Sequence, residues 1–274
     1  MLPVALQLYS IRDEVQKDMK AALQKVKNMG YDGVEFAGLY GHTPAEVKAI
    51  CEEVGLTPIS AHVPIDDMVK DTEGTVAAYA EIGCKFIVVP YVIEERRPGG
   101  SKFDQTIEDM KMIGETANKH GMTLLYHNHD FEFVKLSGLY GLDFLYEAVP
   151  ADVLATELDT CWVKVAGEDP AAYIRKYAGR CPVVHLKDFI GVKKEGAVLY
   201  ALIQADGSDD VKVETEQEPD FDFRPVGYGK QDIPGIIKAG LESGAQWFIV
   251  EQDRSTERPA LEAAKMSCDY VRGL

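Results

Sequence analysis

The sequence lacks the features that commonly identify membrane, secreted and dinucleotide-binding proteins. No stretch approaches the roughly 18 consecutive apolar residues of a membrane span, and the first residues show neither the basic nor the long apolar region of a secretory signal. The five cysteines form no CxxC pair, which is typical of reduced thiols. No GxGxxG motif follows the first apolar run. We therefore expect a cytoplasmic protein that makes no membrane contact.

Positive charge is also scarce. The chain has 29 Lys and Arg residues against 45 Asp and Glu residues, a formal net charge of −16. Such an acidic surface repels phosphate backbones and anionic lipid headgroups, so we expect no nucleic acid and no membrane surface as partner. With 274 residues, of which 46% are hydrophobic, the chain is long enough to form one large α/β domain.

Apolar runs alternate with charged helical patterns along the whole chain. We expect strands over residues 4–9, 33–36, 58–63, 86–91, 123–129, 153–159, 183–187 and 247–251. Helices are expected over about 13–29, 44–54, 71–82, 103–120, 139–148, 170–178 and 257–271. Thr43 and Pro44 form a strong helix start signal. Eight such units predict a single-domain (β/α)₈ TIM barrel over residues 1–274, in preference to an open doubly wound sheet.

The connection after the seventh predicted strand is exceptionally long. It forms an acidic insertion over about residues 189–229, in which residues 197–203 have the composition of a hairpin. A loop in this place lies at the catalytic mouth of a barrel, so a lid, an oligomer contact and a mobile acidic surface loop all remain open. Gly227 and Gly229, at its end, permit a close backbone approach to a ligand.

Polar side chains of the metal-ligating kinds follow the last four predicted strands. Functional groups of a parallel barrel lie at the carboxyl ends of its strands, and burying such groups is costly unless they are paired or bound to metal. The pattern therefore predicts a mixed nitrogen and oxygen site for one divalent metal ion, Mn²⁺, Co²⁺, Mg²⁺ or Zn²⁺. The residues are His127, His129, Glu157, Asp159, His185, Lys187 and Glu251, and earlier strands add Glu35 and His62.

Four motifs carry a resemblance to a known family. They are LQLYSIRDE at 6–14, ELDT at 157–160, VHLKD at 184–188 and FIVEQD at 248–253. In order and spacing the chain resembles the xylose isomerase-like barrel superfamily, over essentially its whole length except the insertion. That superfamily includes sugar and sugar-phosphate isomerases and epimerases, inosose dehydratase and endonuclease IV. The resemblance to the endonuclease branch is weak, because Trp162 stands where that branch has a metal-binding histidine and because the net charge opposes DNA binding.

The resemblance implies a metal held by a glutamate, an aspartate, a histidine and a second glutamate. Asp159, His185 and Glu251 match the last three positions, whereas His127 stands in the place of the first glutamate. The missing ligand is then His127, His129 or Glu157, and we favour His127. The expected metal ligands are therefore His127, Asp159, His185 and Glu251.

The resemblance implies carbohydrate chemistry on a small-molecule sugar, phosphorylated or not. We expect an isomerase or epimerase that acts through an enediolate on a keto- or aldo-sugar, with Glu251, His129 and Lys187 as catalytic residues. Because His127 replaces a glutamate, a dehydratase or lyase acting on a keto-sugar or inosose is the alternative, and a non-catalytic sugar-binding barrel is a second one. For Lys187, a salt bridge to a neighbouring carboxylate such as Glu157 is as good an explanation as a catalytic role.

Substrate contacts are expected from residues around the metal ligands, although His62 and Trp162 also suit plain packing. Homo-oligomers are common among such barrels. The residues expected to bind substrate are His62, Glu132, Trp162, Glu35 and Glu157.

Overall fold

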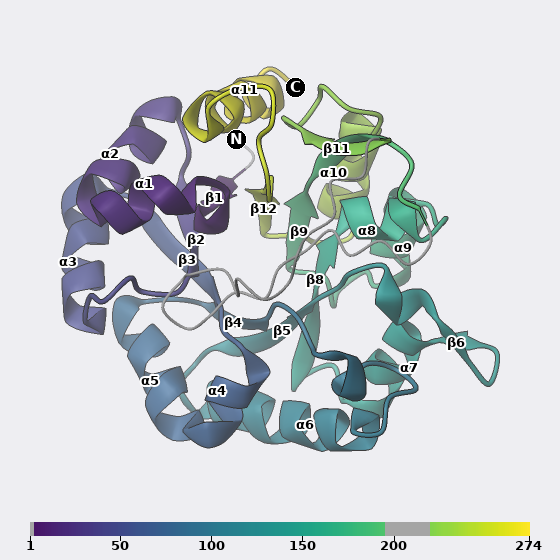
Figure 1. The fold of residues 1–274 in the computed structure, drawn as a ribbon. Helices are drawn as coiled ribbons and strands as arrows, with labels where there is room; N and C mark the ends of the chain where they lie inside the picture. The colour runs from purple at the N-terminus through teal and green to yellow at the C-terminus, as the bar shows by residue number, and fades with distance from the viewer. Residues whose placement is uncertain (1–2, 195–219) are drawn as a thin grey trace.

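The computed structural model describes residues 3–194 and 220–274, which form a closed barrel of eight parallel strands (Figure 1). Around the barrel the strand order is β1, β12, β9, β8, β5, β4, β3 and β2, and β2 pairs again with β1. The predicted TIM barrel is thereby confirmed. The strands are β1 Val4–Gln7, β2 Gly33–Ala37, β3 Thr57–His62, β4 Phe86–Val89, β5 Thr123–His127, β8 Leu154–Asp159, β9 Val183–Leu186 and β12 Trp247–Val250.

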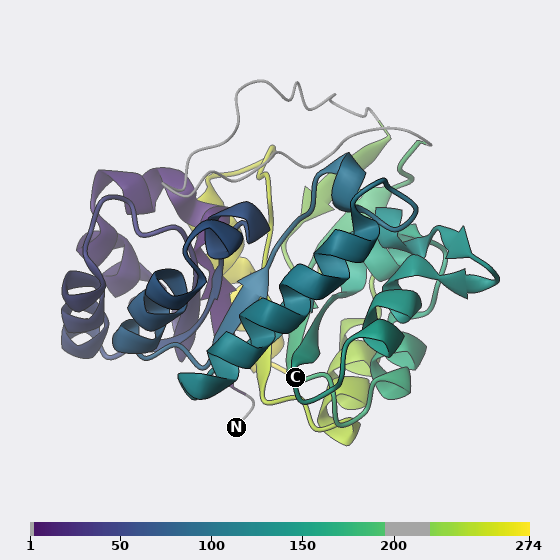
Figure 2. The same ribbon diagram turned by 90° about the horizontal axis from the view of Figure 1, so that it is seen from below.

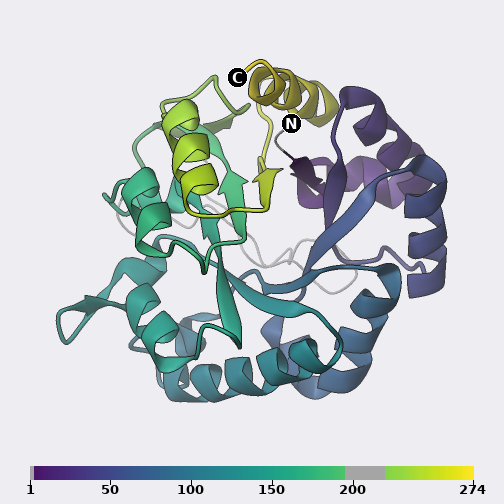
Figure 3. The same cartoon turned by 180° about the vertical axis from the view of Figure 1, so that it is seen from behind.

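Helices surround the strands as an outer ring, seen from both ends of the barrel in Figures 1 and 3. Among the described residues, no helix combines the length and the hydrophobicity needed to cross a bilayer. The helices are α1 Arg12–Lys17, α2 Met19–Met29, α3 Pro44–Val54, α4 Ile65–Lys70, α5 Thr72–Ile82, α6 Phe103–Lys119, α7 Gly141–Ala148, α8 Thr160–Val165, α9 Pro170–Lys176, α10 Ile233–Glu242 and α11 Ala260–Arg272. Short 3₁₀ helices cover Leu8–Ile11, Glu94–Arg96 and Phe131–Phe133, and β6 Lys135–Leu136 pairs with β7 Leu139–Tyr140.

Local capping chemistry fixes the helix ends. Thr43 caps α3 in a capping box with Glu46, and Pro44 occupies the first turn, as the sequence predicts. The single helix predicted over 13–29 is wrong, because Asp18 adopts an extended conformation and accepts a hydrogen bond from the backbone N–H of Ala21. A side chain that caps one helix interrupts the helix before it, so α1 and α2 are separate.

Most strands are shorter than predicted at their carboxyl ends, and α8 is an additional helix. The strand predicted over 4–9 ends at Gln7, where the side-chain oxygen accepts from the Tyr9 backbone N–H and starts a 3₁₀ turn. Asp159 likewise ends β8 and caps α8, since its carboxylate accepts from the N–H groups of Cys161 and Trp162. The polar side chains that end these strands redirect the chain out of the sheet.

The barrel interior is divided into an apolar floor and a polar layer above it. Inward-facing apolar side chains fill the lower part of the barrel, which excludes water from beneath the polar layer. A second, larger apolar cluster joins the outer faces of the strands to the helices. The floor consists of Ala5, Ile59, Phe86, Val88, Leu125, Ala155, Val183 and Ile249.

The described ends of the insertion form a hairpin that stands beyond the carboxyl ends of the barrel strands (Figure 2). β10, Asp188–Gly191, pairs antiparallel with β11, Phe221–Arg224. The hairpin expected over residues 197–203 lies outside the described residues. The aromatic side chains of Phe189, Phe221 and Phe223 are buried against Trp162, so the hairpin covers one side of the mouth.

Candidate metal centre and active site

The period of two along each strand produces the polar layer. Side chains two residues apart on a strand face the same side. On five of the strands, the residue two positions beyond a floor residue is polar and points into the barrel one layer higher. On β8, β9 and β12 a further polar residue follows two positions later. These pairs are Ala5 and Gln7, Leu125 and His127, Ala155 and Glu157, Val183 and His185, and Ile249 and Glu251.

His127, Asp159, His185 and Glu251 lie together at the mouth. Each offers one ligand atom, and these atoms all lie within 4.8 Å of one another. His127 Nε2 is 3.5 Å from Asp159 Oδ2, and His185 Nδ1 is 3.1 Å from Glu251 Oε2. Asp159 Oδ2 is buried and has no hydrogen-bond partner in the described part of the chain. Two imidazoles and two carboxylates form a donor set suited to a divalent transition metal, so the predicted ligands fit an ion.

Lys187 supplies positive charge to the same carboxylates. Its Nζ lies 3.0 Å from Glu251 Oε2, 3.4 Å from Asp159 Oδ2 and 2.7 Å from Asp253 Oδ1, and its side chain is 2% exposed. The alternative pairing with Glu157 is therefore not the one that the structure shows. Burial raises the pKa of Asp159 to about 7, although Lys187 opposes this shift. Burial acts in the same direction on Glu251, but Lys187 and His185 outweigh it, so the pKa of Glu251 is held well below its usual range.

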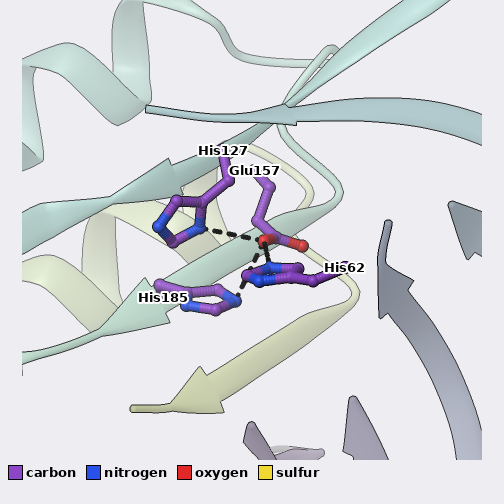
Figure 4. Close-up of side chains that lie close together, drawn as sticks. All are labelled: His62, His127, Glu157 and His185. Atoms are coloured by element: carbon purple, nitrogen blue, oxygen red, sulfur yellow. Dashed lines mark hydrogen bonds and ion pairs between the residues drawn. The ribbon is translucent and has the colours of Figure 1, made fainter. Parts of the chain in front are cut away.

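One layer lower along β8, two residues before Asp159, Glu157 is surrounded by the imidazoles of His62, His127 and His185 (Figure 4). Glu157 Oε1 lies 2.7 Å from His62 Nε2, 3.0 Å from His127 Nδ1 and 3.1 Å from His185 Nε2. Glu35 Oε1 completes the group, at 3.1 Å from His62 Nε2 and 2.9 Å from His185 Nε2. The ligand atoms of His62, His127, Glu157 and His185 also lie within 4.8 Å of one another, so this group is a second candidate position for an ion.

Electrostatics distinguish the four histidines at the mouth. Burial lowers the pKa values of His62 and His185, but the neighbouring carboxylates of Glu35 and Glu157 outweigh burial. The pKa of His62 therefore rises to about 10, and the pKa of His185 rises well above its usual value. The pKa values of His127 and His129 stay well below the ordinary value, chiefly because burial disfavours the charged form. His127 and His129 are therefore neutral imidazoles at physiological pH.

His129 stands in an aromatic stack beside the ligands. Its ring is stacked on Phe131 at 5.3 Å and on Trp162 at 5.4 Å, and it lies 5.4 Å from the ring of His127. Glu132 lies behind the stack, accepting from the backbone N–H of His129 at 2.8 Å and from the hydroxyl of Tyr126 at 2.6 Å. This arrangement fixes the imidazole and presents it at the edge of the metal ligand set.

The structure adds residues that sequence reasoning did not assign to the site. Gln7 Nε2 and Ser60 Oγ donate to the two oxygens of Glu35, at 2.8 and 2.5 Å. Asn128 joins β5 to β8, since its Oδ1 accepts from the backbone N–H of Asp159 and its Nδ2 donates to the carbonyl of Asp159. Asp253 is the nearest partner of Lys187. Asp253 could have been assigned to the site from the sequence, because it follows Glu251 by two residues and its side chain therefore faces the same way.

All the predicted site residues are buried at the mouth. They fall into three neighbouring sets, the metal ligand set with Lys187, the group around Glu157, and the aromatic stack with Glu132. The residues brought together are Glu35, His62, His127, His129, Glu132, Glu157, Asp159, Trp162, His185, Lys187 and Glu251.

Comparison with known proteins identifies the barrel family to which the chain belongs. It is 23% identical to the inosose dehydratase of Geobacillus kaustophilus over 91% of this chain and 85% of that protein. The structure of a sugar phosphate isomerase/epimerase from Parabacteroides distasonis shares 21% identity, with a TM-score of 0.77 over 99% of this chain and 98% of that one. A probable 3-DHS dehydratase from Bacillus anthracis shares 15% identity, with a TM-score of 0.75 over 99% of both chains. Residues 23–273 match the family described as xylose isomerase-like TIM barrel, and the chain belongs to that family.

Proposed function

We propose that the protein is a metal-dependent lyase that removes water from a small polyhydroxylated ketone, such as a keto-sugar or an inosose. The observation that carries the proposal is the pairing of His127 in the ligand set with the neutral, stacked imidazole of His129 at its edge. The inosose dehydratase of Geobacillus kaustophilus, which aligns with 91% of the chain, supports the same reaction class.

The chemistry requires acidification of a C–H bond and a base to take the proton. A bound divalent ion would supply the first, by polarising the carbonyl oxygen of the substrate as a Lewis acid. We assign the second to His129, whose neutral imidazole keeps a nitrogen lone pair free to take the proton. The C–H electrons form the new C=C bond as the C–O bond at the next carbon breaks. The imidazolium of His129 returns its proton to the departing hydroxyl, which leaves as water.

Three further residues have supporting roles in the proposed reaction, and the first of them is Lys187. The Lys187 ammonium, between Glu251 and Asp253, stabilises negative charge that develops on the substrate oxygen. Trp162, within 5.2 Å of Lys187 Nζ, offers an apolar wall for one face of the substrate ring. Glu132 fixes the backbone of His129 and so acts through it.

A sugar isomerase or epimerase is the second candidate, because the same ligand set would also support proton transfer through an enediolate. Glu251 favours it, since a carboxylate with a lowered pKa is available as a base. The two candidates differ in the mass of the product. A lyase product is lighter than its substrate by one water and absorbs ultraviolet light as an enone, whereas an isomerase product has the substrate's formula.

The test uses the full-length protein, stripped with a chelator and reloaded with Mn²⁺, Co²⁺, Mg²⁺ or Zn²⁺ in turn, and incubated in D₂O with an inosose and with keto-sugars. We expect an ultraviolet-absorbing product lighter by one water from the reloaded protein alone. His129→Gln should lower the rate at least about 100-fold while the protein still binds metal. Full activity after chelation would contradict the metal requirement, and deuterium incorporation without loss of water would identify the isomerase.

A further inference from the structure

We propose that Glu157 is a positioning residue that selects which ring nitrogen of His127 and of His185 binds the metal, and is not itself a ligand. The inference rests on the proposed metal centre. It assigns the ion to the set formed by His127, Asp159, His185 and Glu251, and it gives the group around Glu157 a supporting role.

The rings of His127 and His185 each have one nitrogen beside Glu157 and the other nitrogen beside a carboxylate of the metal ligand set. His127 directs Nδ1 to Glu157 Oε1 at 3.0 Å and Nε2 to Asp159 Oδ2 at 3.5 Å. His185 directs Nε2 to Glu157 Oε1 at 3.1 Å and Nδ1 to Glu251 Oε2 at 3.1 Å. Each ring therefore spans from the lower group to the upper ligand set, and Glu157 Oε1 is shared by the lower nitrogens of both rings (Figure 4).

A carboxylate that faces an imidazole nitrogen determines where the ring carries its hydrogen. An ionised carboxylate is an acceptor only, so each nitrogen that it contacts donates an N–H. For His127 this places the hydrogen on Nδ1 and leaves the Nε2 lone pair facing Asp159. For His185, Nε2 faces both Glu35 Oε1 at 2.9 Å and Glu157 Oε1 at 3.1 Å, which places a hydrogen on Nε2. Nδ1 faces Glu251 and carries a hydrogen there in the metal-free protein, so Nδ1 is the nitrogen that would give up its hydrogen to bind an ion. Carboxylate partners commonly orient metal-bound histidines in this way.

Atomic separations favour the upper set as the ligand set. Ligand atoms about 2.0–2.1 Å from a tetrahedral ion stand about 3.4 Å apart. The separation of His127 Nε2 and Asp159 Oδ2, at 3.5 Å, matches that spacing, whereas His185 Nδ1 and Glu251 Oε2 stand closer, at 3.1 Å. The contacts of Glu157 Oε1, at 2.7, 3.0 and 3.1 Å, are those of hydrogen bonds.

Glu157 is itself held in place by residues from the opposite side of the barrel. His62, at the end of β3, lies between Glu157 and Glu35, at 2.7 and 3.1 Å. Glu35 is fixed in turn by Gln7 and Ser60. The carboxylate that orients the two ligand histidines is thus part of a chain of hydrogen bonds across the barrel. The competing assignment is that Glu157 binds the ion directly, since its Oε2 has no hydrogen-bond partner among the described residues.

The first experiment needs no substitution. The wild-type protein is labelled with ¹⁵N, loaded with Zn²⁺, and the histidine rings are assigned by long-range ¹H–¹⁵N correlation. We expect His127 to bind Zn²⁺ through Nε2 with a hydrogen on Nδ1, and His185 to bind through Nδ1 with a hydrogen on Nε2. Zn²⁺ bound to Nδ1 of His127 would overturn the inference.

The second experiment compares Co²⁺ binding by the wild type, Glu157→Gln and Glu157→Ala, using chelator competition for affinity and the visible spectrum for coordination. Both variants should bind about 10- to 100-fold more weakly with the wild-type spectrum. Thr156→Val, on the opposite face of β8, is the control for strand perturbation and should bind like the wild type. A changed spectrum would make Glu157 a ligand, and unchanged affinity would remove its positioning role. If the wild type bound no Co²⁺, the proposed metal centre itself would fail.

Discussion

The pKa of a single buried carboxyl, that of Glu132, links the site to the stability of the protein. Glu132 is fully buried behind the aromatic stack and accepts from Tyr126 and from the backbone of His129. Burial raises its pKa to about 8, although both hydrogen bonds favour the ionised form. In the unfolded chain the same group ionises near its ordinary value of about 4.3. Between these two pKa values the folded protein therefore holds a proton on Glu132 that the unfolded chain has released.

This difference predicts a falling stability with rising pH. Below about pH 4, Glu132 is protonated in both the folded and the unfolded chain, and its contribution to the free energy of unfolding is fully present. This contribution is lost as the pH rises toward 8. The free energy of unfolding of the wild type should fall relative to that of Glu132→Gln by up to about 1.4 kcal/mol per pH unit between pH 5 and 8. Urea unfolding of both proteins across this range measures the effect. Parallel pH profiles would contradict it.

A second residue-scale prediction concerns Lys187, whose ammonium balances the carboxylates of the ligand set. Lys187→Met keeps an unbranched side chain that is one atom shorter, but leaves Glu251 and Asp159 buried without the ammonium. Breaking a buried ion pair in this way costs about 3–5 kcal/mol. We expect the metal-free variant to lose that much stability in urea unfolding. Zn²⁺ should add more stability to the variant than to the wild type. An equal effect on both proteins would show that the Lys187 ammonium does not take the place of the metal ion in balancing the carboxylates.

At the scale of elements, Asp188 connects the last part of the insertion to the barrel. Its Oδ2 accepts from the backbone N–H groups of Gly227 and Gly229, at 3.0 and 2.9 Å, and its Oδ1 accepts from that of Gln231 at 3.0 Å. The two glycines permit a close approach, as expected, but what they approach is Asp188. A β-carbon on Gly229 would lie 2.1 Å from Asp188 Oδ1 and 2.5 Å from the carbonyl oxygen of Phe189.

Gly229→Ala should therefore be clearly destabilising. The added methyl group displaces the Asp188 carboxylate and deprives backbone N–H groups of their acceptor, at a cost of about 1–3 kcal/mol for each buried group. Thermal unfolding of Gly229→Ala checks this. Gly273→Ala, where the nearest atoms are 3.4 Å from the added carbon, is the matched control and should unfold like the wild type. Equal midpoints for both variants would mean that Asp188 does not hold this segment.

The periodicity of the strands made the barrel and most of the candidate site predictable. Alternation along each strand places Asp159, His185 and Glu251 inward, and parallel strands bring their ends together whatever their separation in the sequence. The break between α1 and α2 was not predictable from apolar spacing, because it depends on the extended backbone of Asp18. The contact of His62 with Glu157 was not predictable either, since it crosses the barrel between β3 and β8, which do not pair.

At the scale of the whole molecule, closure makes the first and last strands mutually dependent. β1 pairs with β12 in the register Val4 to Phe248 and with β2 in the register Ala5 to Gly33. The two tryptophans of the chain report on opposite ends of this structure. Trp162 is buried at the mouth in α8, whereas Trp247 begins β12 and packs against the apolar floor.

We expect both ends of the barrel to unfold together. In Trp162→Phe and Trp247→Phe, the remaining tryptophan follows one end, and the urea profile of its fluorescence should coincide with that of far-ultraviolet circular dichroism in the same variant. A closed sheet whose first and last strands pair has no boundary at which half of it remains stable. Fluorescence and dichroism midpoints that differ within either variant would reveal independently unfolding parts.

The polar layer has a consequence for how such a protein changes over time. Each of its members is carried by a separate strand end, above an apolar floor that holds the backbone in place. A point mutation at one end can therefore exchange a single donor and leave the other strands where they are. The mouth can therefore change one donor at a time. Under the proposed function, the imidazole at position 127 is the donor whose exchange for a glutamate would separate a barrel that expels a leaving group from one that moves a proton.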